Sequence, residues 1–561
     1  MIILIILANI RAGFICLRVL NLSVVIIPTH YQFSYALLEA LLPLDAVTLQ
    51  DELSRLVAAE LIHQRGRLPH ATFTFKHVLI QETAYQSLLR DTRRQLHQHI
   101  ADLLEHQGDE LTTPEPELLA HHYTAAGLNS QAVSYWRLAG RVAIAHSAHI
   151  EAISHLRQGL ALLDTLPASP ERSAEELSLR TSLGTTFIAT KGYAAPEVET
   201  AYIRARELCQ ELGNASRLLQ VLFGLQALYL TRGVLQTAHQ LGEECLALAT
   251  RQADPPRVPH AHFALGSTLF FLGNFILARQ HLEQAIAFYD LQVHRTRGLN
   301  DTGVSSLILS AWMVWALGYP DQALARIQEA IDRAQELSSP FSLVYALACA
   351  PFIDQNCGDL PTAQERAEAG YKLSKEQEFP HWLALSTAFE GWAMAARGQG
   401  QEGCEQLQQG LKLWRATGAE QMVPCLLALL AETYGQSGQV EEGLQAVAEG
   451  MMTAEQHAQH HYLAELYRIQ GELYLMPSEA DETAAQASFD QALRIARTQQ
   501  AKSLELRATI SLSRLWQRQG QPQQAHTLLA DVYQWFSEGF ETGDLQAAKT
   551  LLNTLEREIP S

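Results

Sequence analysis

From about residue 31 onward, apolar residues recur at spacings of three and four positions, and Ala, Leu, Gln and Glu dominate the composition. This spacing places apolar side chains on one face of an α-helix, so it predicts amphipathic helices almost throughout. One segment departs from the pattern. In residues 61–75, LIHQRGRLPHATFTF, two short runs with β-forming residues flank a Gly/Pro turn. This arrangement predicts a short β-hairpin.

The elements around the hairpin outline a small N-terminal domain. Two helices are predicted before it, and a third, His77 to Arg90, follows it. Helix, helix, hairpin, helix is the order of a winged-helix domain, which we place at residues 32–105. The polar segment HQGDELTTPEP, residues 106–116, is typical of a linker to the remaining chain.

An internal repeat dominates the rest of the sequence. Its signature is a Gly followed five residues later by a small residue and an apolar helix. It occurs at Gly127/Ala132, Gly233/Ala238, Gly273/Ala278, Gly318/Ala323, Gly358/Ala363, Gly398/Gly403, Gly438/Gly443 and Gly520/Ala525. Between Gly233 and Gly438 the steps are 40, 45, 40, 40 and 40 residues. A fixed period of this size predicts an α-solenoid of stacked antiparallel helix pairs.

The clearest unit, LGSTLFFLGNFILARQHLEQA at Leu265 to Ala285, resembles the tetratricopeptide pattern. It has Leu-Gly and then an Ala twelve residues after that Gly, although the repeat is about six residues longer than the usual 34. Ala278 and Ala285 allow close helix approach, and larger apolar side chains fill the space between the helices. We therefore expect an all-α, tetratricopeptide-like solenoid of about eleven helix pairs over residues 117–555.

In the tetratricopeptide register, seven aromatic residues fall at inner-face positions of successive first helices. They are Phe223, Phe263, Phe270, Trp312, Trp315, Phe352 and Trp392. Aromatic rings along a solenoid groove are suitable anchors for a protein or peptide partner. Alternatively, the longer helices bury these rings between repeats, which is the interpretation we prefer.

The first 31 residues have a different composition. They are strongly apolar, but Arg11 and Arg18 interrupt them before a stretch reaches the roughly 18 residues that a membrane-spanning helix needs. No basic residue precedes the first apolar run, which disfavours a signal peptide. Residues 19–27 are rich in β-branched residues and are compatible with one buried strand. We expect a remnant of a lost upstream domain or a misplaced start rather than a membrane anchor.

The charge balance argues against nucleic acid as the main partner. The 561 residues include 41 Lys and Arg and 60 Asp and Glu, for a formal net charge of −19. Such a chain repels phosphate backbones. The predicted DNA-reading helix of the winged-helix domain, residues 47–61, carries Asp51, Glu52 and Glu60 against only Arg55.

The chemistry-bearing motifs are missing or weak. The sequence has no G-x-x-x-x-G-K-[ST] phosphate loop, no C-x-x-C and no H-E-x-x-H. His457 and His461 share one helical face, but no third ligand is fixed nearby, so we predict no metal site. The seven cysteines form no framework, and apolar neighbours around Cys349 and Cys425 predict buried thiols in a reducing cytosol. We predict no catalytic centre and a cytoplasmic location.

A family resemblance rests on specific strings. The segment FTFKHVLIQETAYQSLLRDTRRQLHQHIADLLE, Phe73 to Glu105, looks like the end of the ATPase part of bacterial class III adenylate/guanylate cyclases with an AAA-type (STAND-like) signal-transducing ATPase and a tetratricopeptide tail. The similarity continues through PELLAHHYTAAG, KGYAAPEVETAY, LGYPDQAL, QQAKSLELRA and WFSEGFETGDL, over about residues 33–555. The family order is cyclase, phosphate-loop ATPase, winged helix and repeats, of which only the last two are present.

The resemblance implies a regulatory role without transferring any catalytic residue. ATP or ADP and Mg²⁺ are expected only with the missing upstream domains. Related ATPases place an ADP-sensing His where Phe75-Lys76-His77 opens a helix, so His77 is either a remnant of that sensor or a capping or packing residue. We expect an interaction or ligand-sensing module whose partner is a protein, a peptide or the upstream domains. The alternative is the tail of a split cyclase; a transcription regulator resembling the maltose activators would need a basic helix-turn-helix, which is lacking.

Overall fold

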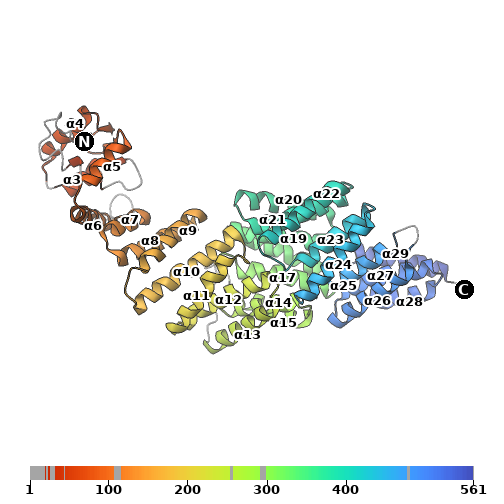
Figure 1. Ribbon diagram of the computed structural model, residues 1–561. Coiled ribbons are helices and arrows are strands. Elements are labelled where there is room, and N and C mark those ends of the chain that lie inside the picture. The colour runs from red at the N-terminus through yellow and green to blue at the C-terminus, as the bar shows by residue number, and fades with distance from the viewer. Residues whose placement is uncertain are drawn as a thin grey trace. The chain divides into compact units, whose positions relative to one another are not determined.

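The computed structural model describes residues 19, 20, 23, 25, 32–42, 44–106, 115–252, 257–290, 299–476 and 480–559. The chain is mostly helical and forms two compact units, Met1–Leu183 and Gly184–Ser561 (Figure 1). The division falls inside one helix, α10 (Pro170–Lys191), rather than at the predicted linker, most of which (107–114) lies outside the described residues. No helix within the described ranges has the length and apolar composition needed to cross a bilayer.

The first unit contains the predicted hairpin. Strands β2 and β3 pair antiparallel, and β1 pairs with the other edge of β3, giving the order β1-β3-β2. The predicted order of helix, helix, hairpin, helix is confirmed. The elements are β1 (Gln32–Ser34), α3 (Tyr35–Leu41), α4 (Ala46–Ala58), β2 (Ile62–Arg65), β3 (Thr72–Phe75), α5 (Val78–Ser87) and α6 (Arg90–His106).

Aromatic and aliphatic side chains form the core beside this sheet. The Phe33 ring lies 5.6 Å from that of Phe73, and Val19 and Val25 are buried in the same core. The described residues among 19–25 are helical, so the expectation of a strand there is wrong. β-branched residues lower helix propensity by only a fraction of a kcal/mol, which burial of the apolar face outweighs. Part of the N-terminal segment therefore belongs to the core of this unit.

The rest of the chain consists of helix pairs. Twenty-two described helices lie between Pro116 and Glu558, in agreement with about eleven pairs. They are α7 (Pro116–Ala126), α8 (Asn129–Ala145), α9 (His149–Leu163), α10, α11 (Pro196–Glu211), α12 (Ala215–Thr231), α13 (Leu235–Gln252), α14 (Val258–Phe271), α15 (Phe275–Ala287), α17 (Thr302–Ala316), α18 (Pro320–Glu336), α19 (Pro340–Cys357), α20 (Leu360–Glu376), α21 (Pro380–Ala396), α22 (Gly400–Ala416), α23 (Val423–Gln436), α24 (Val440–Gln456), α25 (Leu463–Tyr474), α26 (Glu482–Gln499), α27 (Lys502–Arg518), α28 (Pro522–Tyr533) and α29 (Gly543–Glu558).

The pair α14 and α15 shows how a repeat packs. Ala278, Leu282 and Ala285 are fully buried between the helices, as the sequence predicts. A Cβ on Gly266 would lie 2.9 Å from the Leu282 side chain, so only Gly permits this approach. The turn after α14 has Gly273 at φ +79°, a left-handed conformation that ends the helix with little strain only for Gly.

Within the second unit, the chain winds into two superhelical turns that contact each other. We call residues 184–379 the first turn and residues 380–559 the second turn. The carbonyl oxygen of Thr231 accepts from the amide of Glu420 at 2.8 Å, and that of Phe271 accepts from His460 at 3.0 Å. The Ser503 hydroxyl donates to the carbonyl of Trp315, 188 positions earlier, at 2.6 Å. We call this line of contacts the seam.

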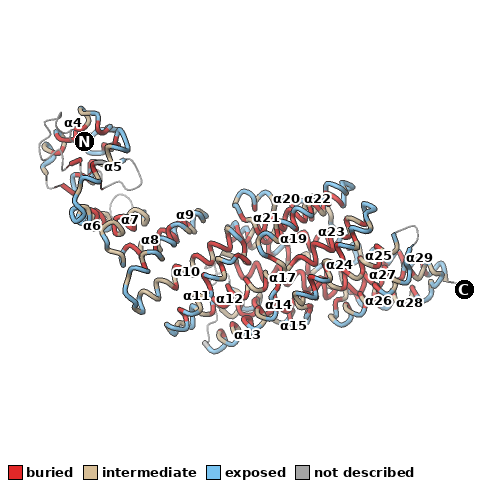
Figure 2. Tube along the Cα trace, in the orientation of Figure 1, coloured by how far each residue is buried: buried red, intermediate tan, exposed pale blue. Residues whose placement is uncertain are grey.

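The seam satisfies backbone groups that a helix cannot satisfy itself. The last carbonyls of an α-helix have no partner within that helix. Thr231 and Phe271 are the last residues of α12 and α14, and the second turn supplies their donors. The same packing encloses α17, in which every residue is buried, and Figure 2 shows the buried positions concentrated where helices face one another.

Candidate functional site

The repeat glycines distinguish the covered edge of the solenoid from its open edge. In the first turn, a Cβ on Gly273 would lie 2.4 Å from the Gln499 side chain, and one on Gly318 would lie 2.5 Å from the Trp535 ring. The corresponding Gly398, Gly438 and Gly520 have nothing within 4 Å. The seam therefore covers the loops at Gly273 and Gly318 and leaves the loops at Gly398, Gly438 and Gly520 exposed.

Four of the seven aromatic residues singled out in the sequence lie at this seam and are buried. Phe270, Trp312, Trp315 and Phe352 are at most 3% exposed. Trp312 and Phe352 have ring centroids 4.5 Å apart. The Phe352 ring lies 5.7 Å from that of Tyr462, which belongs to the second turn. The second turn thus covers this part of the predicted groove, and these four rings are packed in the interior.

The other three aromatic residues remain partly accessible. Phe223, Phe263 and Trp392 are half-buried. Phe223 on α12 and Phe263 on α14 have ring centroids 6.1 Å apart, and the His260 ring lies edge-on to Phe223 at 5.5 Å. Two consecutive first helices therefore present adjacent rings to solvent, and we call Phe223, His260 and Phe263 the aromatic patch.

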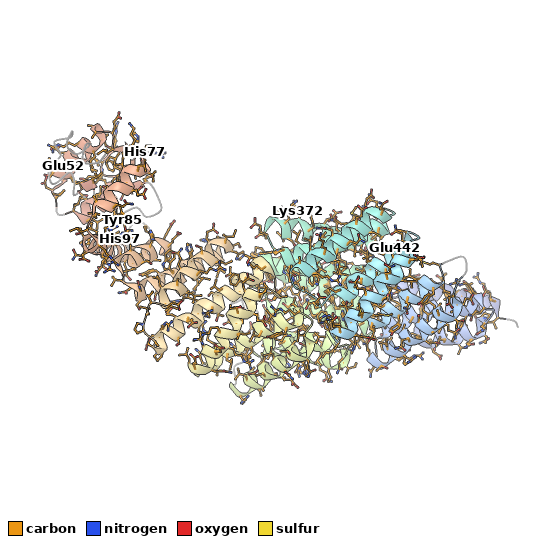
Figure 3. All side chains as sticks on the ribbon, viewed as in Figure 1. Glu52, His77, Tyr85, His97, Lys372 and Glu442 are labelled. Atoms are coloured by element: carbon orange, nitrogen blue, oxygen red, sulfur yellow. The ribbon has the colours of Figure 1, made fainter. Side chains whose placement is uncertain are left out.

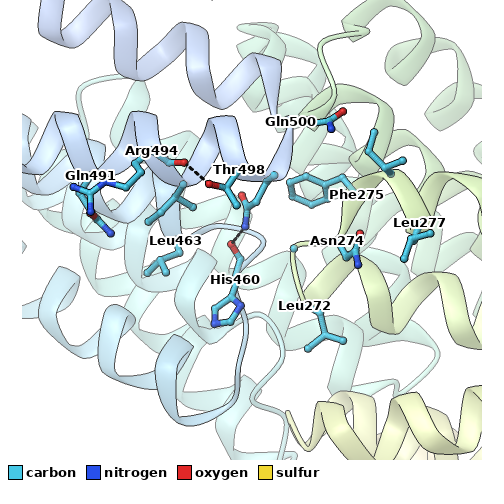
Figure 4. Close-up of a pocket in the computed structure, with 14 residues that line it drawn as sticks. Leu272, Asn274, Phe275, Leu277, His460, Leu463, Gln491, Arg494, Thr498 and Gln500 are labelled. Carbon is cyan, nitrogen blue, oxygen red and sulfur yellow. Dashed lines mark hydrogen bonds between the residues drawn. The ribbon is translucent and has the colours of Figure 1, made fainter.

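A cleft of about 740 Å³ opens across the seam, and we call it the seam cleft (Figure 4). The first turn contributes residues 272–277, and the second turn contributes His460, Leu463 and several residues between Gln491 and Gln500 at the end of α26. The Gln499 amide donates to the carbonyl of His460 at 2.8 Å and so fixes one wall. No sequence pattern pointed to this cleft, because its two sides are far apart in the chain.

His77 lies immediately before α5, as the sequence predicts. Its side chain is exposed and makes no capping hydrogen bond (Figure 3). His77 is thus the N-cap residue of α5 through its backbone carbonyl oxygen, which accepts from the amide of Ile80, and not through its side chain. Its role as a remnant of a nucleotide sensor stays a prediction. In the predicted DNA-reading helix, the single basic residue Arg55 pairs with Glu52 at 2.9 Å.

The histidine and cysteine side chains considered as metal ligands or reactive groups are packed in the interior. His461 is 3% exposed, and its ring lies 4.8 Å from that of Phe271. Among the residues that the structure describes, no three His, Cys, Asp or Glu side chains gather as metal ligands would. Cys349 and Cys425 are buried free thiols, as predicted, and burial raises the pKa of both, which disfavours the reactive thiolate.

The first unit contains a buried relay of hydrogen-bonded side chains that no sequence pattern predicted. The Tyr85 hydroxyl lies 3.0 Å from Nε2 of His97, whose Nδ1 lies 2.9 Å from Nδ1 of His122 (Figure 3). Burial lowers the pKa of His97 to about 4, with smaller contributions from His121 and Arg93. The relay ties α5, α6 and α7 together.

An ionic cluster in the second unit spans the seam as well. The Arg507 guanidinium donates to the side-chain Oδ1 of Asn356 at 2.8 Å and lies 3.1 Å from Glu465 and 3.4 Å from Asp544. Arg468 also contacts Glu465, at 2.7 Å. Opposite charges at this distance offset the cost of burying Glu465, so the cluster joins three second-turn helices to α19 of the first turn.

Comparisons with known proteins agree with this architecture. The tetratricopeptide repeat family matches residues 259–284 and 506–531, which cover α14–α15 and α27–α28. The solenoid is built from tetratricopeptide-type repeats. Solenoids of this type are protein- and peptide-binding scaffolds. The first matched segment contains most of the unit that resembled the pattern in the sequence.

Two kinds of similar proteins were found. The chain is 27% identical over 461 residues to an uncharacterized protein of Rhizobium meliloti (strain 1021), covering 80% of this chain and 44% of that protein, so it spans less than half of this relative's length. A Rap protein complexed with Competence and Sporulation Factor is 12% identical with a TM-score of 0.48, covering 65% of this chain and 98% of that chain. A signal transduction ATPase with numerous domains and a tetratricopeptide repeat sensor, from Pyrococcus horikoshii, is 10% identical with a TM-score of 0.35, covering 98% and 65%.

Proposed function

We propose that this tetratricopeptide-type solenoid binds a protein or peptide partner, as the sensing module of a signal-transduction protein whose ATPase and nucleotide cyclase lie outside these residues. The observation that carries the proposal is the aromatic patch on α12 and α14. The seam covers the buried rings but leaves this patch accessible, and aromatic side chains provide most of the energy of many interfaces.

The wider signalling context rests on the resemblance of residues 73–105 and of the repeat strings to cyclase-associated ATPases. In this proposal the chain has no catalytic centre, and nucleotide and Mg²⁺ bind only to the upstream parts. Binding can regulate those parts if the partner prefers one arrangement of the attached domains over another. A cyclase and phosphate loop encoded by an adjacent reading frame would favour the alternative, in which this chain is the tail of a split cyclase.

Selection of a phage-displayed library of short peptides on the immobilised chain tests the proposal. We expect related peptides to be enriched on the unmodified chain and lost on the F223A/F263A double variant. The variant F288A removes a ring that is 54% exposed outside the patch and serves as the matched control. W312A removes a buried ring and is expected to unfold the repeats, whereas the patch variants keep the helical circular dichroism. Equal enrichment on the unmodified chain and on F223A/F263A would refute the patch as the partner site.

A further inference from the structure

The seam cleft has the size and walls of a small-ligand site. Its volume of about 740 Å³ falls within the roughly 300–1,000 Å³ typical of ligand pockets. Its apolar wall comes from both turns: Ile276 and Leu277 lie on α15, Leu463 on α25 and Ile495 on α26. Ile276 is 38% and Leu277 42% exposed, so an apolar ligand that covered them would remove apolar surface from water.

The charge of the cleft is opposite to that of the chain. None of its fourteen lining residues is Asp or Glu, although the chain has 60 of them, and Arg494 is the one Lys or Arg in the lining. Within the described structure, Arg494 makes no ion pair shorter than 4 Å; Asp490, one helical turn earlier, interacts with Arg494 electrostatically but is outside the lining. A guanidinium binds a carboxylate with two parallel hydrogen bonds, which favours an anionic group at this wall.

Neutral donors and acceptors complete the polar side. Asn274 precedes α15 but makes no capping hydrogen bond with its side chain, which leaves its amide available to a ligand. Gln491 and Gln500 are further amides in the lining (Figure 4). Amides fix the orientation of a ligand without selecting its charge, so Arg494 is the residue that determines the preference for an anion.

The position of the cleft couples binding to the seam. The His460 amide, which donates across the seam to Phe271, belongs to a residue of the lining. A ligand that touches residues 272–277 and α26 together binds only when the two turns are in contact. Such a ligand stabilises the closed seam by mass action, because the separated turns cannot hold it.

We propose that the seam cleft binds a carboxylate attached to a short apolar chain, and that occupancy strengthens the contact between the two superhelical turns. This site is separate from the aromatic patch, so neither proposal depends on the other. A free alkyl carboxylic acid and the C-terminus of an apolar peptide both present a carboxylate on an apolar chain. Titration with each of them distinguishes the two ligands.

Isothermal titration of the full chain tests binding. The probes are hexanoate, octanoate and decanoate, the corresponding alcohols, and the peptide Leu-Leu-Ile with a free or an amidated C-terminus. We expect saturable binding, at one site per chain, of a carboxylate but not of its neutral counterpart. R494Q should weaken binding about tenfold or more, whereas R518Q, which removes an exposed arginine outside the cleft, should not change it. Whether the alkyl acids or the peptide bind more tightly identifies the source.

Hydrogen exchange at the His460 amide tests the coupling. A bound carboxylate should slow exchange of this amide in the unmodified chain and in R518Q, and should do so in R494Q only at correspondingly higher concentration. The proposal is wrong if no carboxylate binds at millimolar concentration, or if R494Q binds as tightly as the unmodified chain. Binding that leaves the exchange rate of His460 unchanged would refute the coupling to the seam.

Discussion

The amide of His460 donates a 3.0 Å hydrogen bond to the carbonyl oxygen of Phe271, although the two residues lie 189 positions apart. Phe271 ends α14, so this bond replaces one that the helix itself cannot make. Phe271 and the two neighbours of His460, Gln459 and His461, are buried, and a backbone group left without a partner there would cost about 1–3 kcal/mol. The solenoid is therefore held by contacts between its turns as well as between neighbouring repeats.

Replacing repeat glycines by alanine should distinguish the contribution of the seam to stability from the backbone strain that alanine introduces at any positive-φ position. Gly318 and Gly438 both have positive φ, at 97° and 77°, so each substitution strains the backbone by roughly 1–2 kcal/mol. At Gly318 the added Cβ also meets Trp535 at 2.5 Å and the Lys502 Cβ at 2.8 Å, which adds about 1–3 kcal/mol.

Urea unfolding monitored by circular dichroism measures both losses. G318A should lower the free energy of unfolding more than G438A, because nothing lies within 4 Å of Gly438. Equal losses for the two variants would contradict the covering of Gly318 by the second turn.

His461 should make the protein sensitive to acid. Burial lowers the pKa of His461 to about 3, whereas an unfolded histidine titrates near 6.5. Between these values the unfolded chain binds the extra proton, so the free energy of unfolding falls as the pH falls from about 6.5 towards 3. H461F keeps a ring beside Phe271 and should reduce this slope by up to about 1.4 kcal/mol per pH unit.

Urea unfolding of H461F and of the unmodified chain between pH 4 and pH 7 measures this slope. If H461F retained the full slope, His461 would not be held neutral in the folded protein.

Removing Arg507 should be among the more damaging single changes. Glu465, which is 2% exposed, would retain only Arg468, and Asp544 would lose its nearest cation. Breaking a buried charge pair costs about 3–5 kcal/mol, so R507M should lower the midpoint of thermal unfolding by several degrees. R518M, at an exposed position, should change stability by less than about 0.5 kcal/mol.

A double variant tests whether the uncompensated charge of Asp544 causes part of the stability loss in R507M. Burial raises the pKa of Asp544, and Arg507 opposes that rise. R507M/D544N removes the carboxylate that R507M leaves uncompensated, so it should recover part of the lost stability. Additive losses from the two substitutions would show that Arg507 and Asp544 do not interact.

Local patterns were sufficient to predict the elements. The hairpin at residues 61–75, the helix after His77 and the α14–α15 pair all depend on residues within a few positions of one another, and the structure confirms them. The strand expected at residues 19–27 is wrong at the described positions 19, 20, 23 and 25, because a short apolar run fits a buried strand and a buried helix equally well. Burial of Val19, Leu20 and Val25 in the core accompanies their helical conformation.

The residues before the repeat glycines do not by themselves mark the seam. Apolar pairs precede Gly273 and Gly318, which the second turn covers, and polar pairs precede Gly438 and Gly520, which are exposed. The second turn also covers Gly233, however, which follows the polar pair Thr231-Arg232. The position of the seam therefore depends on how distant repeats meet and not on the residues next to each turn.

By itself, the sequence determined that this protein is a solenoid of helix pairs with a small hairpin domain before it, because the repeat period, the recurring glycines and the hairpin pattern depend on residues close together in the chain. Only the tertiary structure decided that Phe270, Trp312, Trp315 and Phe352 are interior, that Phe223 and Phe263 stay accessible, and that a cleft opens beside His460. The physical reason is that each repeat is rotated slightly relative to the one before it. No single repeat reveals this rotation, but it adds up over about 189 residues until distant helices meet.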